Sequence, residues 1–397
     1  TWIEYDDRFN FQEKQRIGVV GLKHIISVNE KTFLKSVVVG SVDFFEDKTN
    51  FYYFDDGYKD TITDQSHFEN FIFTSSFTLN HKFNPKHTLR TGLILSHKIY
   101  QYDYITLEAV GWQPFFNNKG NTQVLQSFAQ WKFRFHKNWT LNSGAHFTYL
   151  ALNNTWALDP RAALQWQFKP NQSLGLAVGV HSKPEHISTY FIERIGTDGE
   201  ITTPNKPLQL QNAFHIVGSY DLSFANNFRL KLEAYYQYLY NIPISINPTS
   251  EFSILNASNV WGVIFQNDED GSQLVSEGTG RNFGIDITLE KFFSNQYYFL
   301  VTTSIFDSKY RAPNGNLYNT RYANNFLLNV LGGKEFSVGK NKKNLFGLNG
   351  KFTIYGGNRD TPIDLEASQE AGYGIEISGQ KYANKTPVYY RLSLIHI

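Results

Sequence analysis

Hydrophobic and polar residues alternate along this chain over stretches longer than the roughly 5–6 residues usual for strands of soluble sheets. Clear stretches start at Leu125, Phe228 and Asn282. From Phe228, one face carries Phe228, Leu230, Leu232, Ala234, Tyr236, Tyr238 and Tyr240, and the other carries Arg229, Lys231, Glu233, Tyr235, Gln237 and Asn241. Successive side chains of a strand point to opposite faces, so each stretch predicts a long strand with one apolar face and one polar face.

The connections between these strands are alternately short and long. Short connections, rich in Asn, Lys, Pro and Ser, fall near residues 29–31, 84–87, 137–138, 169–172, 225–227, 294–296 and 339–344. Long connections fall at residues 48–65, 101–121, 183–208, 241–280, 307–324 and 356–386, with a shorter one at 153–159. Barrels of the outer membrane have short periplasmic turns and long extracellular loops. The pattern therefore favours an all-β fold, a transmembrane antiparallel β-barrel fragment of about 14–15 strands, the last starting near Pro387.

Composition agrees with this fold class. Aromatic residues make up 16% of the chain although the mean hydropathy is only −0.39, as expected where apolar rings face lipid and the other strand face is polar. No apolar run reaches the ~18 residues of a membrane helix, which excludes a helical membrane protein. The net charge is +1 with scattered Lys and Arg, which excludes a nucleic-acid partner. The absence of Cys excludes disulfides and thiolate sites.

We expect residues 1–397 to be one partial barrel domain. The chain opens at Thr1 without Met or a signal sequence, and the tail at residues 393–397 has the character of a truncation or cloning remnant. An open sheet edge in hydrocarbon leaves backbone groups unpaired, at several kcal/mol each. We therefore expect partner strands both before residue 1 and after residue 397.

Enzymatic and metal chemistry have no support in the sequence. His181, Glu185 and His186 fit no metal-ligand spacing, and Pro184 argues against a helix that would bring them together. The acidic run at residues 267–271 is out of register for a calcium loop, and residues 278–280 lack the Lys of a phosphate cradle. No catalytic triad can be assembled from spacing. We predict a protein that is not an enzyme and has no cofactor and no metal.

Recognition by the long loops is the remaining candidate for function, because aromatic and charged residues on loops held by a rigid wall can bind ligands. Interfacial packing, or packing of the loops on themselves, is the alternative role for any single ring. The candidate ligand-contacting residues are Tyr102, Trp112, Tyr190, Arg194, Trp261, Tyr310, Arg311 and Arg321. The candidate residues that face the barrel lumen are Lys132, Arg134, Arg229, Lys231, Glu233, Asp286 and Glu290.

Several motifs, in this order along the chain, resemble the TonB-dependent outer-membrane receptors of Bacteroidetes-type bacteria. They include Asp159-Pro160-Arg161, Gly179-Val180-His181-Ser182, Asn205-Lys206-Pro207-Leu208, residues 274–278, residues 280–284, Glu290-Lys291-Phe292, Asp307-Ser308-Lys309-Tyr310, Asn319-Thr320-Arg321-Tyr322, residues 333–336, 361–367 and 386–392. The resemblance implies a barrel of about 22 strands filled by an N-terminal plug. It also implies a location in the outer membrane, contact with lipid and with the TonB complex, and an imported ligand such as an iron chelate, cobalamin, a glycan or a peptide. The plug itself is not encoded in these residues.

Three functions remain open. In an active transporter, the lumen-facing residues would contact the plug and the long loops would capture the ligand. A passive porin or structural barrel would have no plug. A soluble secreted glycan-binding sandwich or propeller would bury the aromatic rings in a core.

Overall fold

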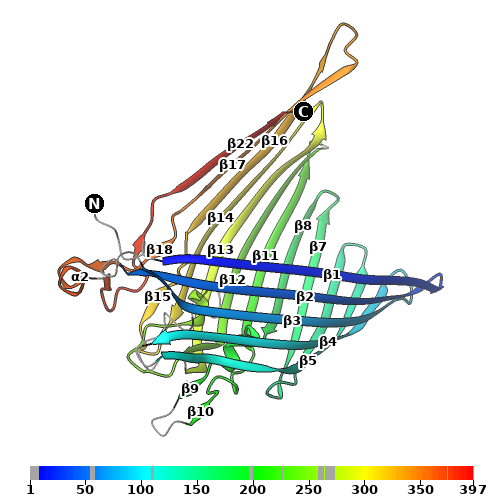
Figure 1. Ribbon diagram of the computed structural model, residues 1–397. Coiled ribbons are helices and arrows are strands. Elements are labelled where there is room, and N and C mark those ends of the chain that lie inside the picture. The colour runs from blue at the N-terminus through cyan, green and yellow to red at the C-terminus, as the bar shows by residue number, and fades with distance from the viewer. Residues whose placement is uncertain are drawn as a thin grey trace.

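The computed structural model describes residues 9–53, 59–108, 111–195, 200–225, 227–257, 263, 273–372 and 374–396. Its main feature is one antiparallel sheet in which fifteen long strands follow one another in chain order (Figure 1). They are β1 Phe9–Asn29, β2 Thr32–Tyr53, β3 Lys59–Lys82, β4 His87–Glu108, β5 Gly111–His136, β6 Trp139–Leu150, β7 Thr155–Lys169, β8 Gln172–Lys183, β11 Gln211–Phe224, β12 Phe228–Ser245, β13 Leu274–Ser294, β14 Tyr297–Arg311, β16 Phe326–Val338, β17 Asn344–Tyr355 and β22 Tyr389–His396. The predicted antiparallel all-β fold and the predicted number of long strands are confirmed.

Short elements lie in the connections. They are the strands β9 Arg194–Ile195, β10 Ile201–Thr202, β15 Leu317–Asn319, β18 Arg359–Asp360, β19 Ile363–Asp364, β20 Ile375–Glu376 and β21 Asn384–Lys385, and the helical turns η2 Ile187–Phe191, η3 Ile254–Asn256 and α2 Leu365–Ala371. No helix in the described residues is long and apolar enough to cross a membrane.

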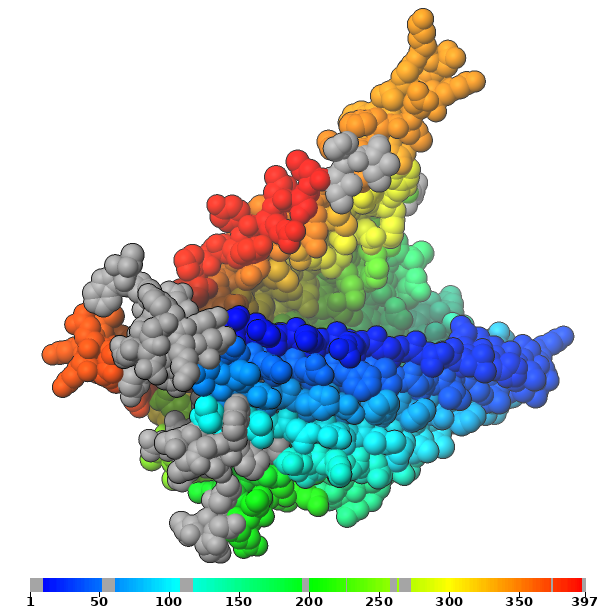
Figure 2. All heavy atoms as spheres, viewed as in Figure 1, coloured from blue at the N-terminus to red at the C-terminus, as the bar shows by residue number. Residues whose placement is uncertain are grey.

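The sheet curls round so that its two edge strands, β1 and β22, come near each other at one end and diverge at the other (Figure 1). In Figure 2 the green and yellow strands of the far wall are visible in a recess between the blue edge and the red edge. Within the described residues β1 and β22 do not pair with each other. The sheet therefore has a convex face and a concave face, with an interior that opens between its edges.

Tight turns join the strands at one end of the sheet, where the sequence predicted them. Between β13 and β14, Asn295 and Gln296 both have positive φ, 52° and 68°, as required by the two-residue turn that matches the twist of a hairpin. Between β3 and β4, the side chain of Asn84 accepts hydrogen bonds from the backbone N–H of Lys86 and of His87. These local turns fix the register of each hairpin.

The side chain of Lys291 stabilises the turn between β13 and β14 by hydrogen bonds. Its side chain is 2% exposed, and its Nζ donates to the carbonyl oxygens of Ser294 and Tyr297 at 2.9 and 3.0 Å and to the Ser294 hydroxyl at 2.8 Å. The ammonium group also lies 3.6 Å from the centre of the Tyr297 ring. This lysine satisfies carbonyl groups that the turn would otherwise leave unpaired.

Two of the predicted long connections are wrong. Residues 48–65 and 101–121 form mostly strand, because β2 to β5 continue as paired hairpins that leave only residues 54–58 and 109–110 between strands. At about 3.3 Å per residue, a strand of 22 residues such as β2 spans about 70 Å, far more than the ~25 Å apolar band of a membrane barrel. Outside that band a strand no longer needs an apolar face, so the alternation fades while the backbone pairing persists. The predicted connection at 241–280 is also too wide, since the strands run to Ser245 and from Leu274.

The convex face carries exposed aliphatic side chains and aromatic rings. Leu158 and Ile305 are 56% and 58% exposed, whereas a soluble sandwich would bury such residues between two sheets. Close to the tight turns, rings on this face form a chain of contacts: Phe83, Trp131, Phe133, Phe135, Trp139, Trp166 and Phe168, and further along Phe224, Phe228 and Phe299. We call these residues the turn-side aromatic belt, and its position is that of the aromatic girdle at a membrane interface.

Candidate functional site: the loop assembly and the inner wall

The long connections gather at the end of the sheet opposite to the tight turns (Figure 1). Two of them, the described parts of residues 184–210 and 246–273, fold against the extended part of β4. Rings of Tyr100 and Phe191 stack with centroids 4.9 Å apart, and Tyr190 and Ile254 belong to the same buried cluster. We call this the loop cluster. Since Tyr100 contacts a loop that comes from β8 and β11, its side of β4 is the concave side.

Tyr102 lies at the centre of the residues that the strands contribute to the loop cluster. It is fully buried, its hydroxyl donates to Asn70 Oδ1 at 2.5 Å, and its ring meets the edge of Phe68. On the loop side, Tyr190 in η2 is 1% exposed, and its hydroxyl oxygen accepts a hydrogen bond from the backbone N–H of Glu185. Burial raises the pKa of Tyr190 to about 12 and also raises the pKa of Glu185, whose side chain bonds to Gln211.

A second set of contacts ties together the loops after β12, β14 and β17. Glu251 accepts hydrogen bonds from the hydroxyl of Tyr318 through its carboxylate and from the hydroxyl of Tyr310 through its backbone oxygen, both at 2.9 Å. The same carboxylate accepts from the backbone N–H of Gly379. Asn256 accepts from the backbone N–H of Arg321 at 2.8 Å. One loop therefore holds two others in place.

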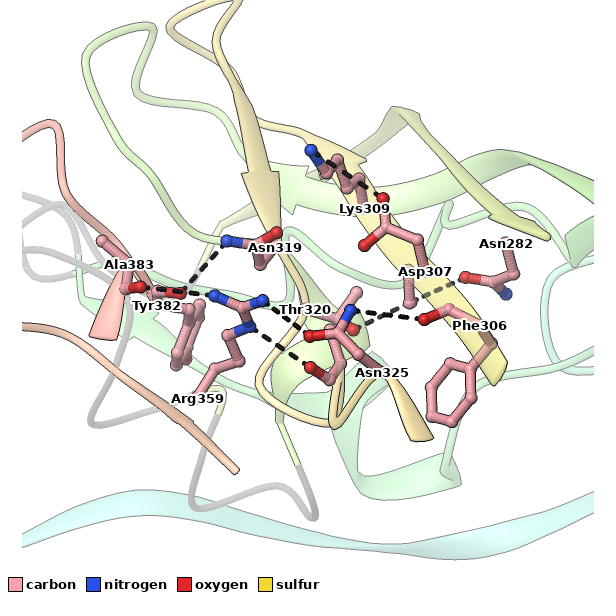
Figure 3. Close-up of polar contacts among 12 residues, drawn as sticks. Asn282, Phe306, Asp307, Lys309, Asn319, Thr320, Asn325, Arg359, Tyr382 and Ala383 are labelled. Carbon is pink, nitrogen blue, oxygen red and sulfur yellow. Dashed lines mark hydrogen bonds and ion pairs between the residues drawn. The ribbon is translucent and has the colours of Figure 1, made fainter. Parts of the chain in front are cut away.

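Arg359 connects the last two long loops by hydrogen bonds (Figure 3). Its guanidinium group donates to the carbonyl oxygens of Ala323 and Ala383 at 3.2 and 3.3 Å and to the side chain of Asn325 at 2.9 Å. The two ends of the loop after β17 can lie side by side only because Gly357 has no side chain. A Cβ at this position would collide with the carbonyl of Thr386. The fixed fork of arginine suits three separate acceptors.

Three of the resemblance motifs meet in one hydrogen-bond chain. Ser308 donates to Asn282 Oδ1 at 2.6 Å, and Thr320 donates to Ser308 at 2.8 Å (Figure 3). These residues lie on β13, on β14 and in the loop that follows β15. The three motifs, which are separate in the sequence, therefore share one hydrogen-bond network.

The candidate ligand-contacting residues lie in different environments. Tyr102, Tyr190 and Tyr310 are buried inside packed clusters, and in this conformation they offer no ring surface to a ligand. Arg194 and Arg311 are exposed and bond to Gln273 and to the carbonyl of Gly315. Arg321 is half-buried beside Asn256. The side chains of Trp112 and Trp261 lie outside the described residues. Ligand contact by these residues stays a prediction.

The pairing register places all seven candidate lumen-facing residues on the concave face. Starting from Tyr102 and its neighbours on β4, the cross-strand pairs Thr88–Lys132, Gln130–Gly144, Gly144–Arg161, Arg161–Gly179, Gly179–His215, Ser219–Glu233 and Glu233–Asp286 carry that face round the sheet. Arg134, Arg229, Lys231 and Glu290 share it by the alternation of side chains along their strands. Their contact with a plug remains a prediction.

Charges on the inner wall are partly paired with each other. Arg229 Nε donates to both carboxylate oxygens of Asp221 at 3.2 and 3.0 Å, and Lys231 Nζ lies 2.6 Å from Glu233. Glu233 and Asp286 line a hollow of about 520 Å³ together with Gln237 and Asn282. No group of three or more His, Asp or Glu side chains in the described residues is placed to hold a metal ion. The wall is thus a hydrophilic, charged surface on the inside of the curled sheet.

Sequence reasoning missed Glu251, Asn256 and Arg359. Each makes its contacts through partners distant in sequence, the bond from Glu251 to Gly379 spanning 128 residues. No local pattern distinguishes them from solvated loop residues.

Solved structures share this fold at low sequence identity. The ferric-catecholate import receptor Fiu of E. coli K12 matches 98% of this chain with a TM-score of 0.66 and 10% identity, over 58% of its own length. The fold is that of a TonB-dependent receptor barrel. The pyoverdine outer membrane receptor FpvA of Pseudomonas aeruginosa PAO1 matches 97% of this chain, with a TM-score of 0.66 and 10% identity over 55% of its own length. The RagAB peptide importer matches 88% with a TM-score of 0.57 and 11% identity, over 48% of that chain.

The chain spans about half of the length of these three proteins, between 48% and 58%. The names of these neighbours describe receptors and an importer, and none of them describes an enzyme. No protein-family model and no curated protein sequence matches the chain.

Proposed function

We propose that this chain forms the larger part of the barrel of an outer-membrane receptor, which binds a ligand at its loop end and imports it with energy from the TonB complex. The observation that carries the proposal is the arrangement of the long loops, which contact one another at one end of the curled sheet. The concave face of this sheet is polar and its convex face is apolar. Such an arrangement can hold a ligand above a hydrophilic passage while lipid covers the convex face. The solved neighbours that share the fold import ferric chelates and peptides.

The edges of the sheet lead us to expect further strands beside it. Unpaired backbone N–H and C=O groups cost several kcal/mol each in hydrocarbon. Among the described residues, β1 and β22 are the two edge strands of the sheet, and each pairs with one neighbouring strand. We infer that in the membrane both strands pair with other strands of the same barrel, and that a plug occupies part of the interior and contacts the seven candidate lumen-facing residues on the inner wall.

Uptake in living cells tests the proposal. A strain lacking the receptor should lose growth on one member of a panel of ferric chelates, cobalamin, glycans and peptides, and the full-length protein should restore growth only where TonB is functional. Restoration without TonB, together with steady ion conductance of the purified protein in planar bilayers, would instead establish a passive porin. A soluble product would support the glycan-binding alternative.

A further inference from the structure

Basic and amide side chains gather in a second hollow of the inner wall, of about 220 Å³, on the concave face of β5 to β11. Its ionisable lining residues are Arg161, His181 and His215, and the amides of Gln130 and Asn142 also line it. All three ionisable groups are bases, and no carboxylate lines the hollow. This composition differs from that of the hollow lined by Glu233 and Asp286.

The strand register brings the three bases together around one glycine. Gly179 on β8 is opposite Arg161 on β7 and opposite His215 on β11. A Cβ at Gly179 would lie 2.9 Å from the Cβ of Arg161, so a side chain at this position would push the arginine away. His181, two residues further along the same face, has its ring 4.8 Å from that of His215. Ala177, two residues before Gly179 on the same face, also lines the hollow, and its small side chain leaves the space open.

The nearest carboxylate in sequence, Asp159, lies on the same face of β7 as Arg161 and interacts electrostatically with His181, but both of its oxygens accept hydrogen bonds from Ser182. Asp159 is 2% exposed and accepts hydrogen bonds from the backbone N–H of Ser182 at 3.1 Å and from the Ser182 hydroxyl at 2.6 Å. It also lies 3.7 Å from His146. Arg161 makes no ion pair among the described residues, and its side chain is exposed to the interior. The guanidinium fork therefore faces the hollow with its donors available.

We propose that this hollow is an oxyanion-binding site, which takes a carboxylate or phosphate group of a small ligand inside the barrel. The planar guanidinium group of Arg161 can donate two parallel hydrogen bonds to such a group. His181 and His215 can each donate a ring N–H, and the amides of Gln130 and Asn142 add neutral donors. A bare metal cation is disfavoured there because Arg161 would repel it. The proposal depends on the proposed function only in requiring that the concave face is the lumen.

Binding of a simple anion to the purified full-length protein in detergent tests this site. Calorimetric titration with citrate, repeated with inorganic phosphate, should show binding of at least one anion by the unmodified protein. Arg161→Gln should weaken that binding about tenfold or more, because it removes a charged, two-pronged donor. Ala177→Phe should weaken it similarly without changing any charge, by filling the hollow. Lys351→Gln is the matched control, since it removes a positive charge from the same face of β17, outside the hollow.

The outcomes separate cleanly. Heat-modifiable gel mobility first confirms that each variant is folded. Absence of citrate and phosphate binding in the unmodified protein would overturn the proposal, and so would equal weakening by Arg161→Gln and Lys351→Gln. Neither result would affect TonB-dependent uptake, which is measured independently in cells.

Discussion

Replacing Leu232 with Arg tests whether the convex face of β12 meets lipid. Leu232 lies between Tyr220 on β11 and Ile287 on β13, on the face opposite to the charged inner wall. It lies four residues after Phe228 of the turn-side aromatic belt, on the same face of the strand. At about 3.3 Å per residue and a tilt of about 40°, this places Leu232 about 10 Å deeper than the belt. The apolar band of such barrels is about 25 Å tall, so Leu232 is close to its middle.

An arginine near the middle of the band should lower the free energy of unfolding by about 2–4 kcal/mol. This is a shift of roughly 30- to 900-fold in the folding equilibrium. The assay is guanidinium unfolding of the full-length protein in lipid vesicles, followed by the change in gel mobility between folded and unfolded forms.

Lys231→Gln is the matched control, because Lys231 is the adjacent residue and faces the interior. Its ion pair with Glu233 is partly exposed, with 34% and 32% of the two side chains accessible, so its loss should cost no more than about 1 kcal/mol. Equal costs for Leu232→Arg and Lys231→Gln would refute the assignment of the two faces.

Three further changes test the turns and the loops. Lys291→Met should lower the free energy of unfolding by about 1–3 kcal/mol in the same vesicle assay, because it removes the hydrogen bonds that the buried ammonium group donates to the turn; a cost no larger than that of Lys340→Met in an exposed turn would contradict this. Arg359→Lys should speed hydrogen exchange in residues 312–325 and 356–388, since a single ammonium group cannot reach all three acceptors. Unchanged protection would show that Arg359 does not hold these two loops together. Burial raises the folded-state pKa of Glu185, so its protonated form is favoured in the folded loop, and the associated stability is present below the unfolded pKa and lost as pH rises through the folded pKa. Between pH 4 and 7 the unmodified protein should therefore lose exchange protection in residues 185–192 relative to Glu185→Gln, which shares the opposite contribution of His186, whose pKa burial lowers to about 4; identical pH profiles for the two proteins would show that Glu185 is not responsible.

The strands and turns could be predicted because their determinants are local. The alternation from Phe228 to Tyr240 fixes which face of β12 is apolar, since the side-chain period of a strand is two. Asn84, Asn295 and Gln296 favour tight turns through short-range hydrogen bonds and positive φ. These features do not depend on the rest of the chain.

The loop cluster could not be predicted because its determinants are distant in sequence. Tyr102 looked like an exposed loop ring, yet it lies on a strand and is buried by a loop that follows β8. Likewise, Arg161, His181 and His215 are grouped only by the register of three strands. A single sequence does not show which residues on different strands become neighbours.

The most direct test of the central claim is to measure which face of β12 contacts lipid. The chain contains no Cys, so single Cys substitutions at successive positions from Leu230 to Tyr236 can each carry one spin label in the full-length protein in vesicles. The account predicts that collisions with oxygen, which dissolves in lipid, peak at Leu230, Leu232, Ala234 and Tyr236, and that collisions with a water-soluble nickel complex peak at the positions between them. Collision rates with no alternation, or alternation of the opposite phase, would contradict the assignment of an apolar outside and a polar lumen.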